Sequence, residues 1–175
     1  TVLDACSAPG TKTQEIAMFM QNEGEIIAQD IYEKRVQLID HLMLKTGVSI
    51  VKTKVQDSSV LNEEYINKFD RVLLDAPCSG LGDLRHKPEI RFHLKPDNID
   101  ELTSLQKKLL EVNGQYVKEG GILVYSTCTL NKKENEKQIQ TFLKNHSEYE
   151  LIEEKTLFPY IENSDGFYYA KMRRK

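Results

Sequence analysis

Short apolar runs alternate with helical patterns along this chain of 175 residues, and this alternation limits the possible folds more than any other feature. Continuous apolar runs of this length are typical of strands that are buried on both faces. The expected strands span residues 2–5, 25–29, 49–53, 71–75 and 121–126, with two further strands at 148–152 and 167–172. Strands that alternate with helices predict an α/β fold, in which helices cover both faces of a parallel sheet.

The helical patterns between the strands indicate which side chains face the core. The apolar faces are Ile16, Phe19 and Met20 in the first helix, Val36, Ile39 and Met43 in the second, and Leu102, Leu105, Leu109, Val112 and Tyr116 in the third. Spacings of three and four residues predict helices that pack on the sheet. A last helix is expected over residues 132–145.

The composition is that of one globular domain. Hydrophobic residues make up 39% of the chain, enough for a sizeable core, and no linker, repeat or low-complexity stretch divides it. We therefore expect a single domain over residues 1–175, present as a monomer. Because the sequence opens directly on a core strand, we also expect that a preceding N-terminal region is missing from this chain.

The sequence gives no sign of a membrane span, a signal peptide or a metal site. It has no run of 18 apolar residues and no basic stretch followed by an apolar one at its start. Its three cysteines form no CxxC pair, which argues against both a disulfide framework and a zinc site. We expect a cytoplasmic protein with no metal and no membrane partner.

The first strand ends in DACSAPGTKT, and ligands of open α/β sheets bind beyond such strand ends. Its small residues, among them Ala5, Ser7, Ala8 and Gly10, let a ligand approach the backbone closely, and the following helix offers free N–H groups to an anion. The loop matches neither GxxxxGKS/T nor GxGxxG, which disfavours a triphosphate or a dinucleotide. An ordinary turn between strand and helix is the alternative.

Two acidic residues follow the next two strands. Asp30 comes 20 residues after Gly10, where an acid in nucleotide-binding sheets accepts hydrogen bonds from a ribose. Asp57 follows the third strand, where a carboxylate can accept a hydrogen bond from an adenine amine. Either acid alone is more often a solvated loop residue. Together with the small-residue turn they favour an adenosine ligand without a polyphosphate, and S-adenosylmethionine (SAM) is the obvious candidate.

A cysteine lies just beyond the end of the fourth strand, and another lies just beyond the end of the fifth. Asp75, Ala76, Pro77 and Cys78 follow the fourth strand, and Cys128 lies in YSTCTL after the fifth. Free cysteine is often a packing residue, but these two lie in polar turns where packing gains little. Neighbouring strands would bring the two thiols to one pocket.

These motifs resemble the Nol/Nop/Sun family of SAM-dependent RNA 5-cytosine methyltransferases. The resemblance rests on DACSAPGTKT, DAPCSGLGDLRHKPEIRF, YSTCTL and DGFYYAKM, in that order, and covers essentially the whole chain. The bacterial Sun-type enzymes, which modify 16S ribosomal RNA, are the most similar branch. The resemblance implies a Rossmann-like methyltransferase fold, with a mostly parallel seven-stranded sheet whose last strand is antiparallel. It also implies that residues 1–175 are the catalytic domain, without the RNA-binding modules that precede it in the family.

The resemblance assigns a role to each strand-end residue. Cys128 would add to carbon 6 of cytosine, which makes carbon 5 nucleophilic toward the methyl group. Asp75 would bind ring nitrogen 3 and the exocyclic amine. Cys78 would assist release of the product. A neighbour should lower the pKa of Cys128, and the candidates are Lys12, the helix start after Leu130 and the sulfonium of SAM.

The resemblance also implies the cofactor contacts. They are Cys6, Ser7, Ala8, Pro9, Gly10, Thr11, Lys12, Asp30, Asp57 and Asp75. The position of Thr11 is usually a glycine in the family. We expect the threonine to be tolerated, because entry into a helix uses an ordinary φ. Cys6, in the tight turn, is expected to have no catalytic role.

A basic segment over residues 85–95 is the expected contact with RNA. The formal net charge of the chain is −3, which by itself is mildly against a nucleic-acid partner, and a solvated surface is the simpler interpretation of the charge alone. Next to a base-binding pocket, however, Arg85, Lys87 and Arg91 can bind phosphates, and Phe92 can stack on a base.

Three alternatives remain open from the sequence. The same fold can methylate an exocyclic nitrogen or a small molecule, which needs no thiol. It can also serve as a non-catalytic RNA-binding scaffold. Finally, DNA cytosine-5 methyltransferases use the proline-cysteine thiol as nucleophile, so Cys78 and Cys128 could exchange roles.

Overall fold

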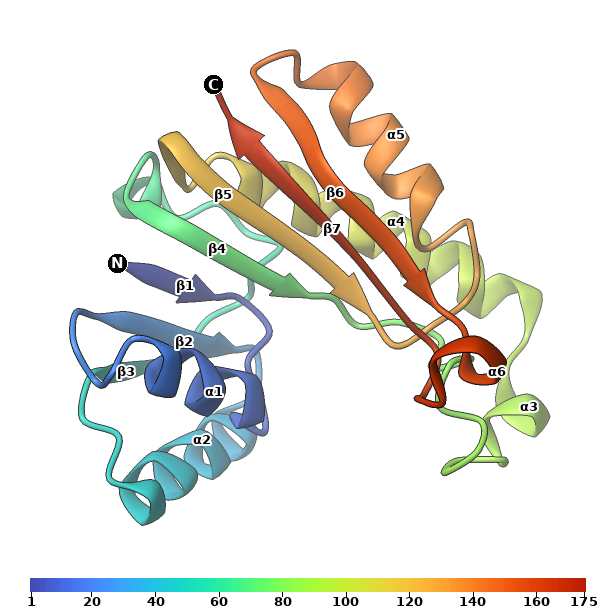
Figure 1. Cartoon of the computed structure of the whole chain (residues 1–175), viewed down its shortest axis with the longest axis horizontal. Helices are drawn as coiled ribbons and strands as arrows, with labels where there is room; N and C mark the ends of the chain where they lie inside the picture. Colours follow the sequence, from blue (N-terminus) through green and yellow to red (C-terminus); the bar gives the residue numbers. More distant parts are fainter.

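Seven strands form one sheet in the computed structural model, which describes the backbone of residues 1–175 and every side chain except that of His93. The strands are β1 (Val2–Asp4), β2 (Ile26–Asp30), β3 (Val51–Val55), β4 (Phe69–Asp75), β5 (Val117–Thr127), β6 (Tyr149–Leu157) and β7 (Phe167–Arg174). Their order is β3-β2-β1-β4-β5-β7-β6 (Figure 1). Strands β1 to β5 pair in parallel, whereas β7 is antiparallel to both β5 and β6. The predicted α/β fold with an antiparallel last strand is confirmed.

Helices cover both faces of the sheet, as expected. The helices are α1 (Thr11–Phe19), α2 (Glu33–Thr46), α3 (Ile90–His93), α4 (Pro96–Gly114), α5 (Glu136–Asn145) and α6 (Pro159–Glu162), with a 3-10 turn η1 (Glu63–Tyr65). Helices α1 and α2 cover the β1–β3 end on one face, and α4 and α5 cover the opposite face near β4 to β6 (Figure 1). Among the helices that the structure describes, none combines the length and apolar character needed to cross a bilayer.

The main core lies between the sheet and helices α4 and α5. Leu3, Leu74 and Leu123, from three adjacent strands, are fully buried there together with Leu109 and Leu110 of α4. Alternate residues of a strand point to opposite faces, so the residues between these point to the other side of the sheet. The core therefore fixes the direction in which β1, β4 and β5 deliver the turns at their carboxyl ends.

Two expected helix faces are only partly correct. Val36, Ile39 and Met43 are buried, as predicted, but α1 packs through Thr13 and Ala17, and Phe19 at its last position is 89% exposed. In α4, Leu109 and Val112 are buried but Leu105 is exposed at a cavity. The last helix begins at Glu136 rather than at residue 132, because the preceding residues form turns.

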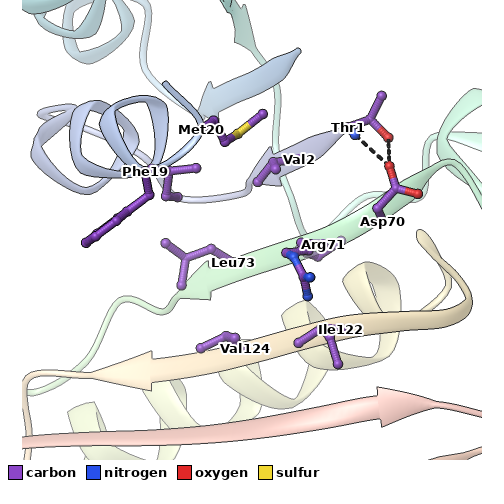
Figure 2. A pocket seen from close by; sticks show the side chains of 11 residues that line it. Thr1, Val2, Phe19, Met20, Asp70, Arg71, Leu73, Ile122 and Val124 are labelled. Atoms are coloured by element: carbon purple, nitrogen blue, oxygen red, sulfur yellow. Dashed lines mark hydrogen bonds and ion pairs between the residues drawn. The ribbon is translucent and has the colours of Figure 1, made fainter. Parts of the chain in front are cut away.

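The sheet face opposite the main core is open beside α1 (Figure 2). Val2, Leu73 and Val124, from three adjacent strands, line a hollow of about 510 Å³ together with Phe19 and Met20. At its edge the amino group of Thr1 binds Asp70 at 2.6 Å.

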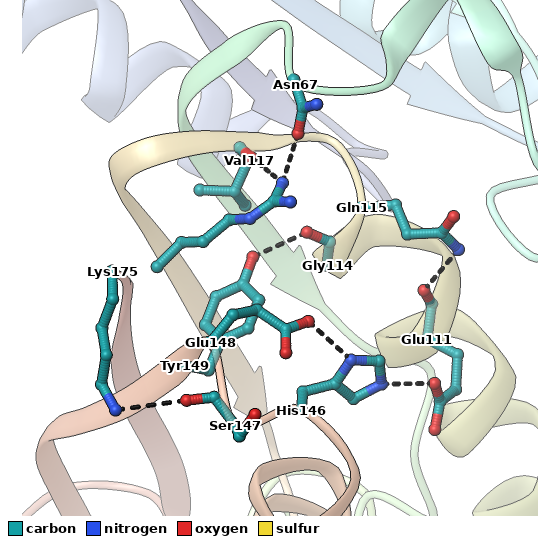
Figure 3. A network of polar contacts seen from close by, with 11 residues as sticks. Asn67, Glu111, Gly114, Gln115, Val117, His146, Ser147, Glu148, Tyr149 and Lys175 are labelled. Carbon is teal, nitrogen blue, oxygen red and sulfur yellow. Dashed lines mark hydrogen bonds and ion pairs between the residues drawn. The ribbon is translucent and has the colours of Figure 1, made fainter.

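A polar network joins the end of α4, the end of α5 and the start of β6, at the edge of the fold remote from α1 and α2 (Figure 3). His146, at the end of α5, lies 2.6 Å from Glu111 of α4 through Nε2 and 3.0 Å from Glu148 through Nδ1. Its ring stacks on Phe142, with 4.4 Å between the ring centroids. Tyr149 donates a hydrogen bond of 2.6 Å to the carbonyl oxygen of Gly114. The network thereby ties α4, α5 and β6 together.

This network predicts a pH-dependent stability. Burial works to lower the pKa of His146, but hydrogen bonds to Glu111 and Glu148 outweigh it and raise the pKa above the ordinary value. The stabilisation is complete below the pKa of unfolded histidine, about 6.5, and is lost as the pH rises through the higher folded pKa. This contribution makes the free energy of unfolding of the unmodified chain higher at pH 6 than at pH 8.5. Urea unfolding of the H146Q variant should show this difference reduced by about 1 kcal/mol. The H41Q variant, at an exposed histidine, should keep the full difference; an equal loss there would contradict this assignment.

Candidate active site

The carboxyl ends of the central strands surround one cavity of about 440 Å³. Every parallel strand except β3 ends in an aspartate or a threonine at this edge, and the turns that follow supply the walls. The lining residues are Ala5, Cys6, Ala8, Asp30, Ile31, Tyr32, Arg35, Gln56, Asp57, Ser58, Ser59, Asp75, Ala76, Pro77, Cys78, Leu105, Leu109 and Cys128. The structure therefore brings together both acids, both strand-end thiols and Asp75, which the sequence placed at separate strand ends.

The turn after β1 is shaped by Gly10 and by hydrogen bonds to β2. Gly10 has a φ of 105°, and a Cβ atom there would lie 3.2 Å from Ile39 of α2, so only glycine suits this close packing. Thr11 is the first residue of α1 and is not among the residues with a positive φ, as expected for entry into a helix. The hydroxyl of Ser7 donates to the carbonyl oxygen of Gln29, so this side chain holds the turn in place. Gly10 and Ser7 thus shape the turn.

A smaller hollow of about 130 Å³ lies beside the start of α1. Its walls are Asp4, Cys6, Ser7, Ala8, Pro9, Thr11, Lys12 and Asp75. Asp4 is 1% exposed; Oδ2 accepts a hydrogen bond of 2.7 Å from Thr13, and Oδ1 has no hydrogen-bond partner among the described residues. Burial raises the pKa of Asp4 to about 7, although the bond from Thr13 opposes this. The free oxygen leaves a buried acceptor for a donor group of a ligand, and sequence reasoning did not identify it.

Asp30 is held at the rim of the cavity by Arg35. The side chain of Asp30 is 3% exposed, and its Oδ1 lies 3.3 Å from Nη1 of Arg35. A second guanidinium nitrogen of Arg35 donates to the carbonyl oxygen of Ala8 at 3.2 Å. Arg35 therefore joins the turn after β1 to the acid after β2. No pattern in the sequence pointed to this arginine, which lies on α2.

Asp57 caps its own turn after β3. Its Oδ1 accepts a hydrogen bond of 2.8 Å from the backbone N–H of Ser59. The buried hydroxyl of Ser58 accepts a hydrogen bond of 2.7 Å from the side chain of Gln29 and donates one to the carbonyl oxygen of Ala5. These bonds fix the third turn against the first two. Asp57 also lines the cavity.

Asp75 is oriented by two partners at the end of β4. Its Oδ2 lies 2.5 Å from Nζ of Lys12, and its Oδ1 accepts 2.7 Å from the hydroxyl of Ser126 at the end of β5. Charge-assisted bonds of this kind are among the strongest in proteins. Lys12 also lies over the ring of Phe167, 5.6 Å from its centroid. Lys12, in the first turn of α1, therefore holds the acid at the end of β4.

The two strand-end thiols are in contact. Sγ of Cys78 lies 3.1 Å from Sγ of Cys128. The hydrogen bond from the Cys78 thiol lowers the pKa of Cys128 to about 7, although burial and Asp75 oppose this. The same bond, with burial, raises the pKa of Cys78. Cys128 is thus the more acidic thiol of the pair.

Among the described side chains, the one that lowers the pKa of Cys128 most is Cys78, which was not among the candidates from the sequence. Helix α5 begins at Glu136, and Lys12 is bound to Asp75. Only the packed structure brings Cys78 into contact with Cys128. Burial raises the pKa of the third thiol, Cys6, to about 12, which fits the expectation that it has no catalytic role.

The basic segment leaves the cavity at a tight backbone crossing. The N–H of Gly82 donates to the carbonyl oxygen of Cys128 at 2.9 Å, and Gly166 donates to the carbonyl oxygen of Gly82 at 2.9 Å. A Cβ atom on Gly82 would lie 1.9 Å from the oxygen of Gly166, so no larger residue fits. The crossing holds the start of the segment against the backbone of Cys128.

The four side chains expected to bind RNA are exposed beyond this crossing, and none of them lines the cavity. Lys87 forms an ion pair of 2.8 Å with Asp83, and the guanidinium of Arg91 lies 4.8 Å from the ring centroid of Phe92. The side chain of Arg85 is exposed to solvent. These residues extend the surface beside the cavity and do not contribute to its wall.

Comparison with known proteins gives a family match and close structural neighbours. Residues 1–173 match the family model described as 16S rRNA methyltransferase RsmB/F. The probable ribosomal RNA small subunit methyltransferase B of Bacillus subtilis (strain 168) is 37% identical over 193 residues, covering 100% of this chain and 43% of that protein. A crystal structure of PH0851 has a TM-score of 0.96 and 36% identity over 99% of this chain and 42% of that one.

The crystal structure of NSun6 from Pyrococcus horikoshii with SFG has a TM-score of 0.90 and 30% identity. It is matched over 99% of this chain and 47% of its own length. The chain thus spans less than half of the length of each of these proteins. The match confirms the family resemblance drawn from the motifs. The chain belongs to the 16S rRNA methyltransferase RsmB/F family and has the fold of SAM-dependent methyltransferases.

Proposed function

We propose that this chain transfers a methyl group from SAM to carbon 5 of a cytosine in RNA, with 16S ribosomal RNA as the substrate, through a covalent bond to Cys128. The observation that carries the proposal is the pair of thiols in contact at 3.1 Å beside Asp75. Methylation of an exocyclic nitrogen needs no thiol, so it leaves this pair without a purpose. Family membership supports ribosomal RNA as the substrate.

The cavity has the chemistry that SAM requires. Asp30 and Asp57 offer carboxylate oxygens to ribose hydroxyls and to an adenine amine, and apolar Ile31 lines the same cavity. The unpartnered Oδ1 of Asp4 suits the ammonium group of the methionine part, and the start of α1 suits its carboxylate. NSun6 from Pyrococcus horikoshii, the relative with SFG, a SAM analogue, supports the same cofactor for this chain. When bound, SAM supplies an electrophilic methyl group on a sulfonium.

Cys128 starts the reaction in this proposal. Its thiolate forms a bond to carbon 6, and the electron pair of the ring double bond moves so that carbon 5 becomes nucleophilic. Nitrogen 3 takes up a proton from solvent as the adduct forms and returns it when the adduct breaks down. Asp75 accepts hydrogen bonds from the exocyclic amine and from this protonated nitrogen 3. Lys12 and Ser126 hold the carboxylate in place, which avoids reorganisation during the reaction.

Cys78 acts after the methyl group has reached carbon 5. The proton on carbon 5 must then pass to solvent water, and the electron pair of the carbon-hydrogen bond reforms the double bond while the bond between carbon 6 and Cys128 breaks. A thiol 3.1 Å from the departing sulfur can donate a hydrogen bond to it as it becomes a thiolate. The higher pKa of Cys78 keeps it protonated for this task.

The RNA would enter over the basic segment. Arg85, Lys87 and Arg91 offer charge to phosphates beside the cavity, and Phe92 is 73% exposed and available for stacking. The target base must leave its stack to reach Cys128, because the sulfur lies at the cavity and not on the surface of the segment.

Trapping with 5-fluorocytosine tests the proposal. Fluorine on carbon 5 cannot leave as a proton, so incubation of the chain with SAM and an RNA fragment of the small subunit containing 5-fluorocytosine should give a covalent complex on a denaturing gel. Unmodified RNA, incubated in parallel with tritiated SAM and digested to nucleosides, should yield 5-methylcytidine. Appearance of N4-methylcytidine without a trapped complex would replace the proposal by nitrogen methylation. Binding of RNA without any methylated nucleoside, under conditions where SAM binds, would favour a scaffold.

A further inference from the structure

The turn between β5 and α5 contains a buried acid to which neither the motifs nor the proposed mechanism assigns a role. Glu134 is 0% exposed, although acidic side chains are rarely buried without partners. Five N–H or O–H groups lie within hydrogen-bond distance of its two carboxylate oxygens. A buried carboxylate this fully bonded holds its neighbours firmly, since each lost bond leaves a desolvated polar group.

Two of the five groups belong to the residue that follows Cys78. The backbone N–H of Ser79 donates to Oε1 of Glu134 at 2.8 Å, and its hydroxyl donates to Oε2 at 2.6 Å. Gln106 of α4 holds the residue on the other side of the thiol, because its Nε2 lies 2.9 Å from the carbonyl oxygen of Pro77 and 3.1 Å from Oε1 of Glu134. The proline-cysteine turn is thus fixed on both sides of the sulfur.

The remaining groups belong to the turn that carries Cys128. The hydroxyl of Thr129, the next residue, lies 3.3 Å from Oε2 of Glu134, and Nδ2 of Asn131 lies 3.1 Å from it. The hydroxyl oxygens of Ser79 and Thr129 are themselves 2.9 Å apart. One carboxylate therefore bridges the two residues that directly follow the two thiols.

The position of Glu134 is fixed independently of the thiols. Tyr125, buried in β5, donates 2.6 Å to its backbone carbonyl oxygen. The side chain of the adjacent Asn135 accepts a hydrogen bond of 2.6 Å from the hydroxyl of Thr127 and donates one of 2.8 Å to the carbonyl oxygen of Thr129. It therefore binds the residue before Cys128 and the residue after it. The acid is anchored to the strand from which Cys128 emerges, and it reaches across to the turn after β4.

We propose that Glu134 is a positioning residue that sets the contact between Cys78 and Cys128 by bridging Ser79 and Thr129. Its consequence for catalysis rests on the proposed function, but the contact itself is a property of the chain without RNA or SAM. Without the bridge, the two turns are joined only by the contact between the Ser79 and Thr129 hydroxyls, by backbone hydrogen bonds and by the sulfur pair.

Loss of the bridge should change the acidity of Cys128. The groups that act on this thiol are Cys78, which lowers its pKa, and Asp75 and Asp83, which raise it; Lys87 lies near enough to be affected by it in turn. The three charged groups do not contact Glu134. If the sulfur atoms separate, the hydrogen bond from Cys78 that lowers the pKa of Cys128 is lost, so this pKa should rise.

The test is the pH dependence of Cys128 alkylation in the E134Q variant. Glutamine keeps the size of the side chain but replaces one acceptor oxygen by an NH₂ group that faces other donors. Iodoacetamide labelling of the peptide that contains Cys128, followed by mass spectrometry, should give a midpoint raised by about one pH unit and labelling about fivefold slower at pH 7. An unchanged profile in a folded E134Q variant would overturn the proposal.

The E111Q variant is the matched control. Glu111 also bridges α4 to a later segment, through His146, but it lies in the network at the opposite edge of the fold (Figure 3). Its loss should lower stability and leave the labelling profile of Cys128 as it is; the same shift in both variants would make the effect one of general loosening and would refute a positioning role.

A second variant keeps the test decisive if E134Q does not fold. Ser79→Ala removes one of the five donors and leaves the carboxylate bonded, and it should raise the midpoint in the same direction by a smaller amount. A folded Ser79→Ala variant with the profile of the unmodified chain would then count against the proposal. Because no arm uses RNA, a failure of the proposed methylation would not alter the result.

Discussion

The Cys128→Ser variant is expected to lose methyl transfer to RNA by at least about 10³-fold, with SAM binding and the free energy of unfolding nearly unchanged. The thiol has a pKa of about 7 through its contact with Cys78, whereas a serine hydroxyl stays protonated and is a far weaker nucleophile. The measurement is transfer of tritium from SAM to RNA, together with the trapped complex on 5-fluorocytosine RNA. Both signals should vanish in this variant.

The Cys78→Ala variant is the matched control, since it changes the other sulfur of the same contact. It should form the covalent complex more slowly, because the bond that lowers the pKa of Cys128 is gone, and should release it more slowly still. A covalent complex should therefore accumulate even on unmodified RNA. The reverse pattern, with a complex in Cys128→Ser and none in Cys78→Ala, would exchange the two roles, as in DNA cytosine-5 methyltransferases.

The Asp75→Asn variant is expected to lower kcat by about 10² to 10³-fold with a much smaller change in SAM affinity. The amide cannot accept hydrogen bonds from both the base amine and protonated nitrogen 3 while it faces Lys12 and Ser126. The lysine would also lose its ionic partner at 2.5 Å. Steady-state kinetics with RNA and calorimetry with SAM separate the two effects.

Asp70→Asn provides the comparison for this change. Asp70 lies in the same strand, at the end remote from the cavity, and it also binds a lysine, Lys118, at 2.7 Å. Its hydrogen bonds to Lys118 and to Thr1 hold its pKa well below the usual range, so its loss should reduce stability modestly. It should leave kcat unchanged. A comparable loss of kcat at both positions would mean that Asp75 acts through stability and not through the base.

The sequence alone predicted the sheet and the edge at which the site lies. Buried parallel strands need continuous apolar runs, and parallel connections place all their carboxyl ends at one edge. Asp30, Asp57, Asp75, Cys78 and Cys128 could therefore be assigned to one pocket from their places after the strands, and the structure brings all of them to one cavity. The bounds of the helices and the burial of Phe19 were predicted less well, because the packing at the end of a short helix depends on which segments lie beside it.

Only the tertiary structure decided how these residues act on one another. The contact between the two sulfur atoms, the pair of Lys12 with Asp75, the anchoring of Asp30 by Arg35 and the bridge made by Glu134 join segments 5 to 63 residues apart. Local sequence patterns report which face of an element is apolar, but a hydrogen bond depends on positions within a few tenths of an ångström. That precision comes from the packing of α4 and the sheet around the turns, and it is the reason that the sequence identified the two thiols while only the fold showed that they contact each other.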